Sequence, residues 1–304
     1  MQNTNGGRPR ADERSVALPQ DCQYLQNAED CVVAEGASAF THLARVKIRG
    51  RSTRAYVKAY QSGDTAQLIG EVVGYTLARR AGLPQPEVAG LIHVPRSVLL
   101  GLPQKSKIAF DDPHLCFATA EVLDANEGRV RSFATVENVA SASNWTIIGR
   151  QALQKFAETW PHFSKMVAID AWTANVDRNL QNVLWVSASE FKLIDHGQLF
   201  GGYQINAGNY IPWPACHCAA ETAFPSKLVD ELLKMPPILS DSSKASIVNC
   251  AEQISCVYGQ SRSELDFWLQ GASADFVHRA HHWLWARTET PSRYLSTTVG
   301  MLDV

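Results

Sequence analysis

The sequence lacks an excess of charge of either sign. Its 304 residues include 28 Lys and Arg and 30 Asp and Glu, which gives a formal net charge of −2 at pH 7. Because long nucleic-acid or membrane footprints normally need a surplus of basic residues, we expect neither a direct nucleic-acid partner nor a membrane partner. The chain is 45% hydrophobic, which is enough to bury a core in one large domain or in two smaller ones that share a cleft.

Long apolar runs and a disulfide pattern are also missing. No window contains enough consecutive apolar residues for a membrane span, and the polar opening MQNTNGGRPRADERS contains no apolar core of a secretory signal. The 7 cysteines are odd in number and scattered, which is typical of reduced thiols. Cys216-His217-Cys218 has no second Cys/His pair at zinc-finger spacing. We therefore expect a cytoplasmic protein with a disordered tail over residues 1–20.

The region after the tail, residues 21–123, is predicted to be rich in strands. FTHLARVKI and RAYVKAY alternate apolar and polar residues around the turn-forming RGRST, which predicts a β-hairpin within residues 35–60. Residues 88–94 and 116–122 indicate two further strands. One long helix separates the hairpin from these strands, with Asp64 as its cap and GLPQP as its end.

Two charged residues of this region each allow two interpretations. Lys58 lies between Tyr56 and Tyr60 on one face of its strand. It is either a solvated charge on an edge strand or a residue that faces a cleft. Glu71 lies beside the apolar stripe of the long helix, where its carboxylate either faces water or contacts a partner on a packed strand.

From about residue 124 onward the pattern becomes mainly helical. We expect Trp268, Trp283 and Trp285 to lie in the core of this region rather than on a binding surface. The sequence thus predicts an α+β fold, with a small β-rich part containing one long helix and a larger, mainly helical part over residues 124–304. Helical periodicity is found in residues 144–160, 163–175, 226–235, 243–259 and 272–288.

A short hairpin interrupts the helical region at NVDRNLQNVLWVSASEFKLIDHG. NVLWV and FKLID are predicted strands joined by the turn-forming SASE, so the hairpin returns Asp195 toward Asp177, with Asn182 between them in sequence. Two carboxylates and an amide oxygen form a hard-oxygen donor set, which prefers Mg²⁺ bridged to phosphate over zinc.

The order of these residues matches the requirements of phosphoryl transfer. Asp177 precedes Asn182 by five positions, which is the spacing of a kinase catalytic loop, and Asp195-His196-Gly197 stands where such enzymes carry a metal-binding Asp-Phe-Gly. Lys58 on an early strand and Glu71 on the next helix would complete the set, as a pair that holds an ammonium against phosphates.

On these motifs the chain resembles the HipA-like kinases, and more distantly the protein-kinase and phosphoinositide-kinase catalytic cores. The resemblance rests on YVKAY, GEVVGYTLARRAGLPQPEV, IDAWTANVDRNLQNVLW and FKLIDHG, and it spans residues 35–202. It implies a bilobal protein-kinase-like fold that binds ATP and Mg²⁺ between a small N-lobe and a larger C-lobe.

The resemblance also implies roles for individual residues. Lys58 would contact the ATP phosphates and Glu71 would position Lys58. Asp177 would be the catalytic base, and Asn182 and Asp195 would bind Mg²⁺.

The sequence departs from the kinase pattern in several places. It contains no G-x-G-x-x-G loop, and the nearest phosphate-covering candidate is EGASAF, in which Gly36 and Ser38 could offer backbone N–H groups. The predicted hinge, residues 118–124, includes Glu121 and would bind adenine through backbone groups. Arg178 follows the catalytic Asp and would pair with a phosphate, pair with an acidic neighbour, or order its own loop. We expect His196 to pack beneath the metal-binding segment.

Three functional hypotheses follow. The first is an ATP- and Mg²⁺-dependent kinase that phosphorylates a protein Ser/Thr hydroxyl. The second is a kinase of the same fold that acts on a small molecule or a lipid headgroup, and the near-neutral charge disfavours the lipid. The third is a pseudokinase that binds nucleotide without catalysis, although such proteins usually lack the lysine, the base or the metal-binding Asp. An antitoxin-like partner is suggested by family analogy alone.

Overall fold

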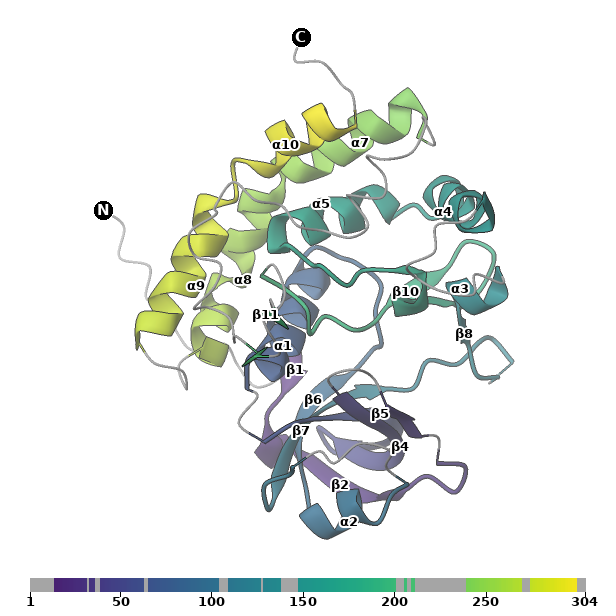
Figure 1. The fold of residues 1–304 in the computed structure, drawn as a ribbon, viewed down its shortest axis with the longest axis vertical. Helices are drawn as coiled ribbons and strands as arrows, with labels where there is room; N and C mark the ends of the chain where they lie inside the picture. The colour runs from purple at the N-terminus through teal and green to yellow at the C-terminus, as the bar shows by residue number, and fades with distance from the viewer. Residues whose placement is uncertain are drawn as a thin grey trace.

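An antiparallel sheet with one parallel edge pair forms the N-terminal part of the computed structural model (Figure 1). The sheet has seven strands in the order β1-β6-β7-β5-β4-β2, with β3 paired to β4. Their bounds are β1 Val16–Ala17, β2 Cys22–Asn27, β3 Val33–Glu35, β4 Ala39–Ile48, β5 Arg51–Tyr60, β6 Ala89–Val94 and β7 His114–Ala120. The described residues are 14–31, 33–35, 39–62, 65–103, 109–126, 128–137, 147–200, 205–206, 209–210, 239–269 and 274–299.

The predicted hairpin is confirmed as β4 and β5. Ile48 pairs with Arg51, so the connection consists of Arg49 and Gly50, whose φ angles are 49° and 80°. Two residues with positive φ are what a tight two-residue hairpin turn requires, and only Gly50 adopts this conformation without a steric cost. The strands predicted at 88–94 and 116–122 are confirmed as β6 and β7, with β7 beginning and ending two residues earlier.

Regular structure begins within the segment that was predicted to be a disordered tail, residues 1–20. Val16 and Ala17 are buried, and as β1 they pair in parallel with Ala89 and Gly90 of β6. A short 3-10 helix follows at Pro19–Asp21. The prediction of a disordered tail is therefore wrong for residues 15–20, because apolar burial against β6 outweighs the polar composition of the surrounding segment.

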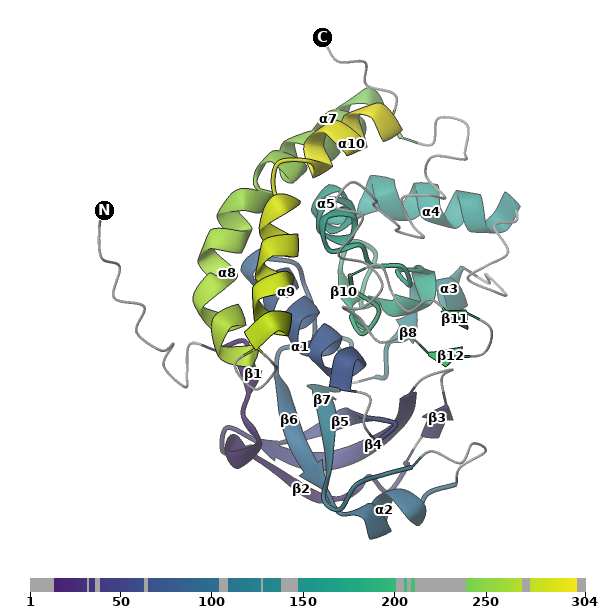
Figure 2. The same cartoon turned by 60° about the vertical axis from the view of Figure 1, so that its left-hand side comes forward.

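The long helix is confirmed as α1, Thr65–Arg80, and it contacts both halves of the molecule. Figure 2 shows α1 between the sheet and the C-terminal helices. At its C-terminal end Arg80 pairs at 2.9 Å with the buried Glu264 of α8, which spans Ile254–Leu269. Ser15 donates to the same carboxylate. The helix ends at Arg80, and Gly82, whose φ is 69°, lies just beyond that end, as GLPQP predicted. The predicted cap Asp64 lies outside the described residues.

The C-terminal part consists mainly of helices, with a small three-stranded sheet on one side. The sheet contains β8 Arg131–Ser132, β9 Val183–Trp185 and β10 Phe191–Leu193, in the order β10-β9-β8. None of the described helices is long and apolar enough to cross a membrane. The helices of this part are α3 Phe133–Val136, α4 Ile147–Thr159, α5 Phe163–Thr173, α7 Asp241–Glu252, α8 Ile254–Leu269, α9 Ala274–Ala286 and α10 Pro291–Thr298.

Shorter elements complete the described chain. They are α2 Arg96–Leu100, the 3-10 helix η2 Leu180–Asn182, and the pair β11 Ile205–Asn206 and β12 Asn209–Tyr210.

Several helix predictions need correction. Residues 243–259 form parts of α7 and α8 rather than one helix, because α7 packs on α5 and α10 whereas α8 packs on α1, and the chain turns at Gln253 to reach both. The helix α10 was not predicted. Trp283 is buried and Trp268 packs against the core, as expected, but Trp285 is 57% exposed and its assignment to the core is wrong. The predicted helix at 226–235 and the Cys216–Cys218 triplet lie outside the described residues.

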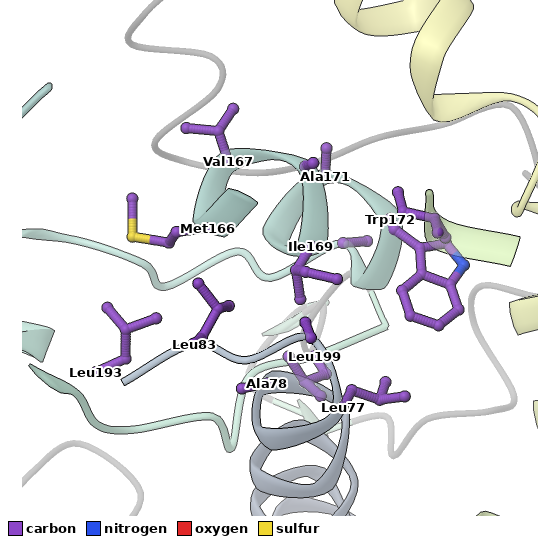
Figure 3. Close-up of a cluster of buried hydrophobic side chains, with 14 of the residues drawn as sticks. Leu77, Ala78, Leu83, Met166, Val167, Ile169, Ala171, Trp172, Leu193 and Leu199 are labelled. Carbon is purple, nitrogen blue, oxygen red and sulfur yellow. The ribbon is translucent and has the colours of Figure 1, made fainter. Parts of the chain in front are cut away.

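The main apolar core joins α1 to the C-terminal helices. Figure 3 shows Leu77 and Ala78 of α1 beneath Ile169 and Trp172 of α5, with Leu199 between them. The Trp172 indole N–H donates to the carbonyl of Leu284 at 2.9 Å, so this large ring also has its polar atom satisfied. Because α1 shares this core through Leu77 and also packs on the sheet through Val72 and Tyr75, the helix connects the two parts of the molecule.

Two glycines of α1 allow an unusually close contact with the segment that follows β10. A Cβ atom added at Gly70 would lie 2.6 Å from the carbonyl oxygen of Gly197, and one added at Gly74 would lie 2.4 Å from the Cβ of His196. Side chains at these positions would force the helix and the Asp-His-Gly segment apart.

The close contact leads to a prediction for Gly74→Ala. In a helix interior this change normally stabilises a protein by about 1 kcal/mol, but here we expect the clash with His196 to lower the free energy of unfolding by about 1–3 kcal/mol. Urea denaturation measures the difference. The matched control is Gly259→Ala in α8, where an added Cβ meets nothing within 4 Å and should stabilise. Equal stabilisation by both changes would contradict the close contact.

Candidate active site

A cleft lies between the N-terminal sheet and the β9–β10 hairpin. One wall comes from β4, β5 and β7, the facing wall comes from the hairpin, and α1 closes one side. The segment that connects the two parts of the molecule closes the other side. The cleft is lined by Thr41, Tyr56, Lys58, Glu71, Tyr75, Pro86, Phe117, Thr119, Ala120, Val122, Arg129, Val130, Leu184, Leu193, Ile194, Asp195 and His196.

Lys58 lies on a central strand of the sheet. β5 pairs with β4 on one side and with β7 on the other, so the interpretation of Lys58 as a solvated charge on an edge strand is wrong. Tyr56, Lys58 and Tyr60 share the face of β5 that points toward the cleft and α1, as the alternation predicted.

The Lys58 ammonium contacts two carboxylates from different parts of the chain. Its Nζ lies 2.6 Å from Glu71 Oε1 on α1 and 2.8 Å from Asp195 Oδ1 after β10. Burial lowers the pKa of Lys58, but the neighbouring Asp195 and Glu71 outweigh burial and raise that pKa above its ordinary value. Burial raises the pKa of Asp195, but Lys58 outweighs this effect and the net shift is downward. Lys58 therefore stays cationic and Asp195 stays anionic.

Glu71 connects the lysine to the Asp-His-Gly segment. The side chain is 1% exposed, and its Oε1 also accepts a hydrogen bond from the Tyr60 hydroxyl at 2.8 Å. Its Oε2 accepts the backbone N–H of His196 at 2.9 Å. Three donors thus hold the carboxylate: Lys58, Tyr60 and the N–H of His196. Of the two interpretations of Glu71, contact with a partner on a packed strand is therefore confirmed and exposure to water is wrong.

Asp195 adopts a left-handed backbone conformation with a φ of 61°. This region is uncommon for residues other than glycine, although Asp tolerates it better than most, and it is often found at functional sites. The conformation ends β10 abruptly and allows the Asp195 carboxylate to reach Lys58 while the next N–H reaches Glu71.

Asp177 and Asn182 lie on a loop that several side-chain amides fix in place. The Asn182 amide nitrogen donates to the Asp177 carbonyl at 2.9 Å, and the Asn179 amide nitrogen donates to the same carbonyl at 2.8 Å. Asn179 also caps η2 by accepting the N–H of Gln181. Since the Asn182 amide nitrogen is used in the loop, the amide oxygen is the atom that can ligate a cation. The Asp177 side chain remains half-buried.

The loop is connected to Asp195 through the hairpin backbone. The N–H of Ile194 donates to the carbonyl of Asn182 at 3.1 Å. The structure brings Lys58, Glu71 and Asp195 together in the cleft, whereas Asp177 and Asn182 are not among the residues that line it. The convergence of the Asp177, Asn182 and Asp195 side chains stays a prediction.

Arg178 is buried beneath the loop. The side chain is 1% exposed, and its Nε lies 2.9 Å from Oδ2 of the buried Asp170 on α5. It also donates to the carbonyl of Ile194 at 2.8 Å, and its NH2 group lies 3.2 Å from His196 Nδ1. Of the three interpretations of Arg178, contact with a phosphate is wrong, because the guanidinium is enclosed by protein. It pairs with an acidic neighbour and orders its loop.

Asp170 and His196 are buried on either side of Arg178. Burial raises the pKa of Asp170, while Arg178 and the Asn175 amide lower it in part. Burial, together with the adjacent Arg178, holds the pKa of His196 well below its ordinary value, so the imidazole is neutral and its Nδ1 accepts from the guanidinium. His196 is 4% exposed and packs beneath the segment, as expected.

Glu121 is held in a ring of charges at the hinge. Its carboxylate lies 2.6 Å from Arg54 Nε and 3.0 Å from Arg129 Nε, and Asp30 closes the ring by pairing with both arginines. The N–H of Glu121 donates to the carbonyl of Arg54 at 2.8 Å. A contact between Glu121 and adenine would therefore have to come from its carbonyl, and this role stays a prediction. Gly36 and Ser38 lie outside the described residues.

Two residues of the site were missed in the sequence. Tyr60 donates a hydrogen bond to Glu71. The sequence feature that could have identified it is its position two residues after Lys58, on the same face of the strand. Asp170 pairs with Arg178, and the signal was a lone carboxylate in the apolar stretch MVAIDAW.

No protein-family model and no curated protein matches this chain. Among solved structures, the chain is similar to the crystal structure of a Helicobacter pylori proinflammatory kinase, CtkA, with a TM-score of 0.53 and 14% sequence identity. The similarity covers 92% of this chain and 97% of that one. The chain therefore has a bilobal, kinase-like α+β fold, with the sheet as its N-lobe and the helical part as its C-lobe.

The buried ion pair leads to a prediction for Arg178→Met. Removing one member of a buried pair leaves an uncompensated charge on Asp170, and we expect the free energy of unfolding to fall by about 3–5 kcal/mol. Urea denaturation of the variant beside Arg131→Met, which removes an exposed arginine from β8, measures the effect. If both variants lose less than about 1 kcal/mol, as exposed sites do, the network does not stabilise the loop.

Proposed function

We propose that this protein is an ATP- and Mg²⁺-dependent kinase of the HipA-like type. The observation that carries the proposal is the double ion pair of Lys58 with Glu71 and Asp195, which joins a strand, a helix and the segment after the hairpin at one cleft. A cation at this position is suited to phosphate oxygens, and a paired lysine of this kind is a recurring part of phosphoryl-transfer sites. The kinase-like fold supports the same reading.

The donor set of the site fits Mg²⁺. Asp195 offers an ionised carboxylate and Asn182 an amide oxygen, and Mg²⁺ is usually bound by one or two carboxylates together with phosphate oxygens. We assign Asn182 and Asp195 as the protein ligands. A bound Mg²⁺ would neutralise charge that develops on the transferring phosphoryl group. Lys58 would hold the non-transferred phosphates, and Glu71 would keep Lys58 oriented.

Asp177 is the proposed catalytic base. As the acceptor hydroxyl attacks, its oxygen forms a bond to the γ-phosphorus and the bond from that phosphorus to the β,γ-bridging oxygen breaks, so ADP leaves. The Asp177 carboxylate orients the hydroxyl and accepts its proton. The amide contacts from Asn179 and Asn182 to the Asp177 carbonyl fix the base relative to the metal ligand.

A protein Ser/Thr hydroxyl is the acceptor that we propose, since the resemblance to HipA-like kinases implies it. A small-molecule or lipid hydroxyl is the second candidate, and the net charge of −2 disfavours an anionic membrane substrate. An antitoxin-like partner rests on family analogy alone.

The proposal predicts that Asp195→Asn and Asp177→Asn each abolish most phosphoryl transfer. Losing the proton acceptor should lower kcat by about 10²–10⁴-fold, and losing the carboxylate that ligates the metal should lower it at least as much. The measurement is transfer of label from γ-labelled ATP with Mg²⁺ to the protein itself and to cell lysate. Asp241→Asn, a fully exposed position at the start of α7, is the matched control and should retain wild-type activity.

The outcomes separate the hypotheses. Label on a protein band that is lost in Asp195→Asn but kept in Asp241→Asn supports a protein kinase. Absence of label, with Mg²⁺–ATP raising the Tm of the wild type but not of Asp195→Asn, would favour a small-molecule kinase or a nucleotide-binding pseudokinase. Absence of both label and stabilisation would refute the assignment of the site to Mg²⁺ and nucleotide.

A further inference from the structure

One aromatic ring of the cleft is accessible. Four aromatic side chains line it within the described residues, and three of them are buried: Tyr75 is 1% exposed, Phe117 2% and His196 4%. The buried three have structural roles, since Tyr75 and Phe117 pack edge-to-face and His196 contacts Arg178. Tyr56 is the remaining one, and it is only half-buried. No role proposed above uses it.

Tyr56 lies at the hinge end of the cleft. It is on the same face of β5 as Lys58, two positions earlier, which places it about 7 Å along the strand from the phosphate-binding ammonium. In the sheet it pairs with Thr119 of β7, which lies within the predicted hinge, residues 118–124. The preceding residue Ala55 pairs with Ala120, the last residue of β7, so Tyr56 lies near the end of β7 from which the hinge continues.

The opposite wall of the cleft is apolar at this end. Leu184 and Leu193 of the β9–β10 hairpin line it, together with Val122 and Val130 from the connecting segment. A planar group held between an aromatic ring and two leucines would be in contact on both faces. Arg129 also lines this end of the cleft. Because its guanidinium pairs with Glu121 and Asp30, we treat it as part of the cleft wall rather than as a phosphate ligand.

The backbone at the start of the hinge has few donors left for the edge of a base. The N–H of Ala120 donates to the carbonyl of Val88 at 2.9 Å, and the N–H of Glu121 donates to that of Arg54 at 2.8 Å. Because these two N–H groups already donate within the fold, they cannot hydrogen-bond to the edge of a base. We therefore expect contacts with the faces of the base to contribute more to nucleotide affinity. Stacking on an aromatic ring tolerates any base, because every base has a π-face.

We propose that Tyr56 is the base-stacking residue of this cleft and that it sets nucleotide affinity with little preference between adenine and guanine. This proposal rests on the proposed function, because it takes the ligand of the cleft to be a nucleoside triphosphate whose phosphates contact Lys58.

The test is isothermal titration calorimetry of ATP, GTP and inorganic tripolyphosphate, each with Mg²⁺, on the wild type and three variants. Tyr56→Ala removes the ring, Tyr56→Leu keeps apolar volume without a π-face, and Tyr56→Phe keeps the ring without its hydroxyl. We expect Tyr56→Ala to weaken ATP and GTP alike by about 5- to 150-fold, the range for loss of one base–aromatic stack. Tyr56→Leu should fall between Ala and wild type, and Tyr56→Phe should stay within about twofold of wild type.

Tripolyphosphate distinguishes stacking from damage to the cleft. It has no base, so its affinity should be the same in all four proteins. Parallel loss of tripolyphosphate and ATP in Tyr56→Ala would overturn the proposal, because the variant would then have disturbed the phosphate site. Equal ATP affinity of Tyr56→Leu and wild type would also overturn it, since apolar filling would explain the role of the residue.

Failure of this inference is distinct from failure of the proposed function. If the wild type binds ATP and Tyr56→Ala binds it equally well, the stacking role is wrong while the nucleotide site stands. If the wild type binds tripolyphosphate but neither ATP nor GTP, or binds none of the three, both proposals are wrong.

Discussion

The Lys58 ammonium lies between two carboxylates that reach it from separate elements, Glu71 on α1 and Asp195 after β10. A charge of this kind is costly to bury without partners, so the folded state needs the strand, the helix and the hairpin to meet at one point. Glu71 extends the arrangement by accepting hydrogen bonds from the Tyr60 hydroxyl and from the N–H of His196. These contacts of Lys58 and Glu71 fix the relative positions of β5, α1 and the segment after β10, and so the geometry of the cleft.

Close backbone packing makes that arrangement rigid. Gly70 and Gly74 bring α1 against Gly197 and His196, at distances that any side chain would prevent. The same helix shares the apolar core of the C-lobe through Leu77 and Ala78 and is tied to α8 through Arg80. As a result α1 behaves as part of both lobes, and the position of Glu71 is set by the C-lobe as much as by the sheet on which Lys58 lies.

A second charged side chain, Arg178, is buried beneath the loop and joins elements of the C-lobe, as Lys58 joins elements at the cleft. Arg178 pairs with Asp170 and donates to the backbone of the segment that ends at Asp195, and it lies against the neutral ring of His196. The loop bearing Asp177 and the segment after β10 that bears Asp195 are thereby fixed to α5. Positioning through buried networks of this kind is how a site keeps its geometry when the residues come from loops.

Local sequence determined most of the sheet and the long helix, and it determined the order of the candidate site residues. Alternation gave β4 and β5 with Lys58 on the cleft face, and the end of α1 followed from GLPQP. The stretch from Asp177 to Asp195 predicted a hairpin, which is confirmed as β9 and β10. Tertiary structure alone decided which of two open interpretations holds: Lys58 faces the cleft because β7 covers the second edge of β5, and Arg178 is buried because Asp170 lies beneath the loop. Partners distant in sequence leave no periodicity behind, so neither pairing could be derived from local pattern. The pairing of Val16 and Ala17 with β6 and the exposure of Trp285 also depend on contacts between residues far apart in the sequence. Local composition carries no information on such contacts.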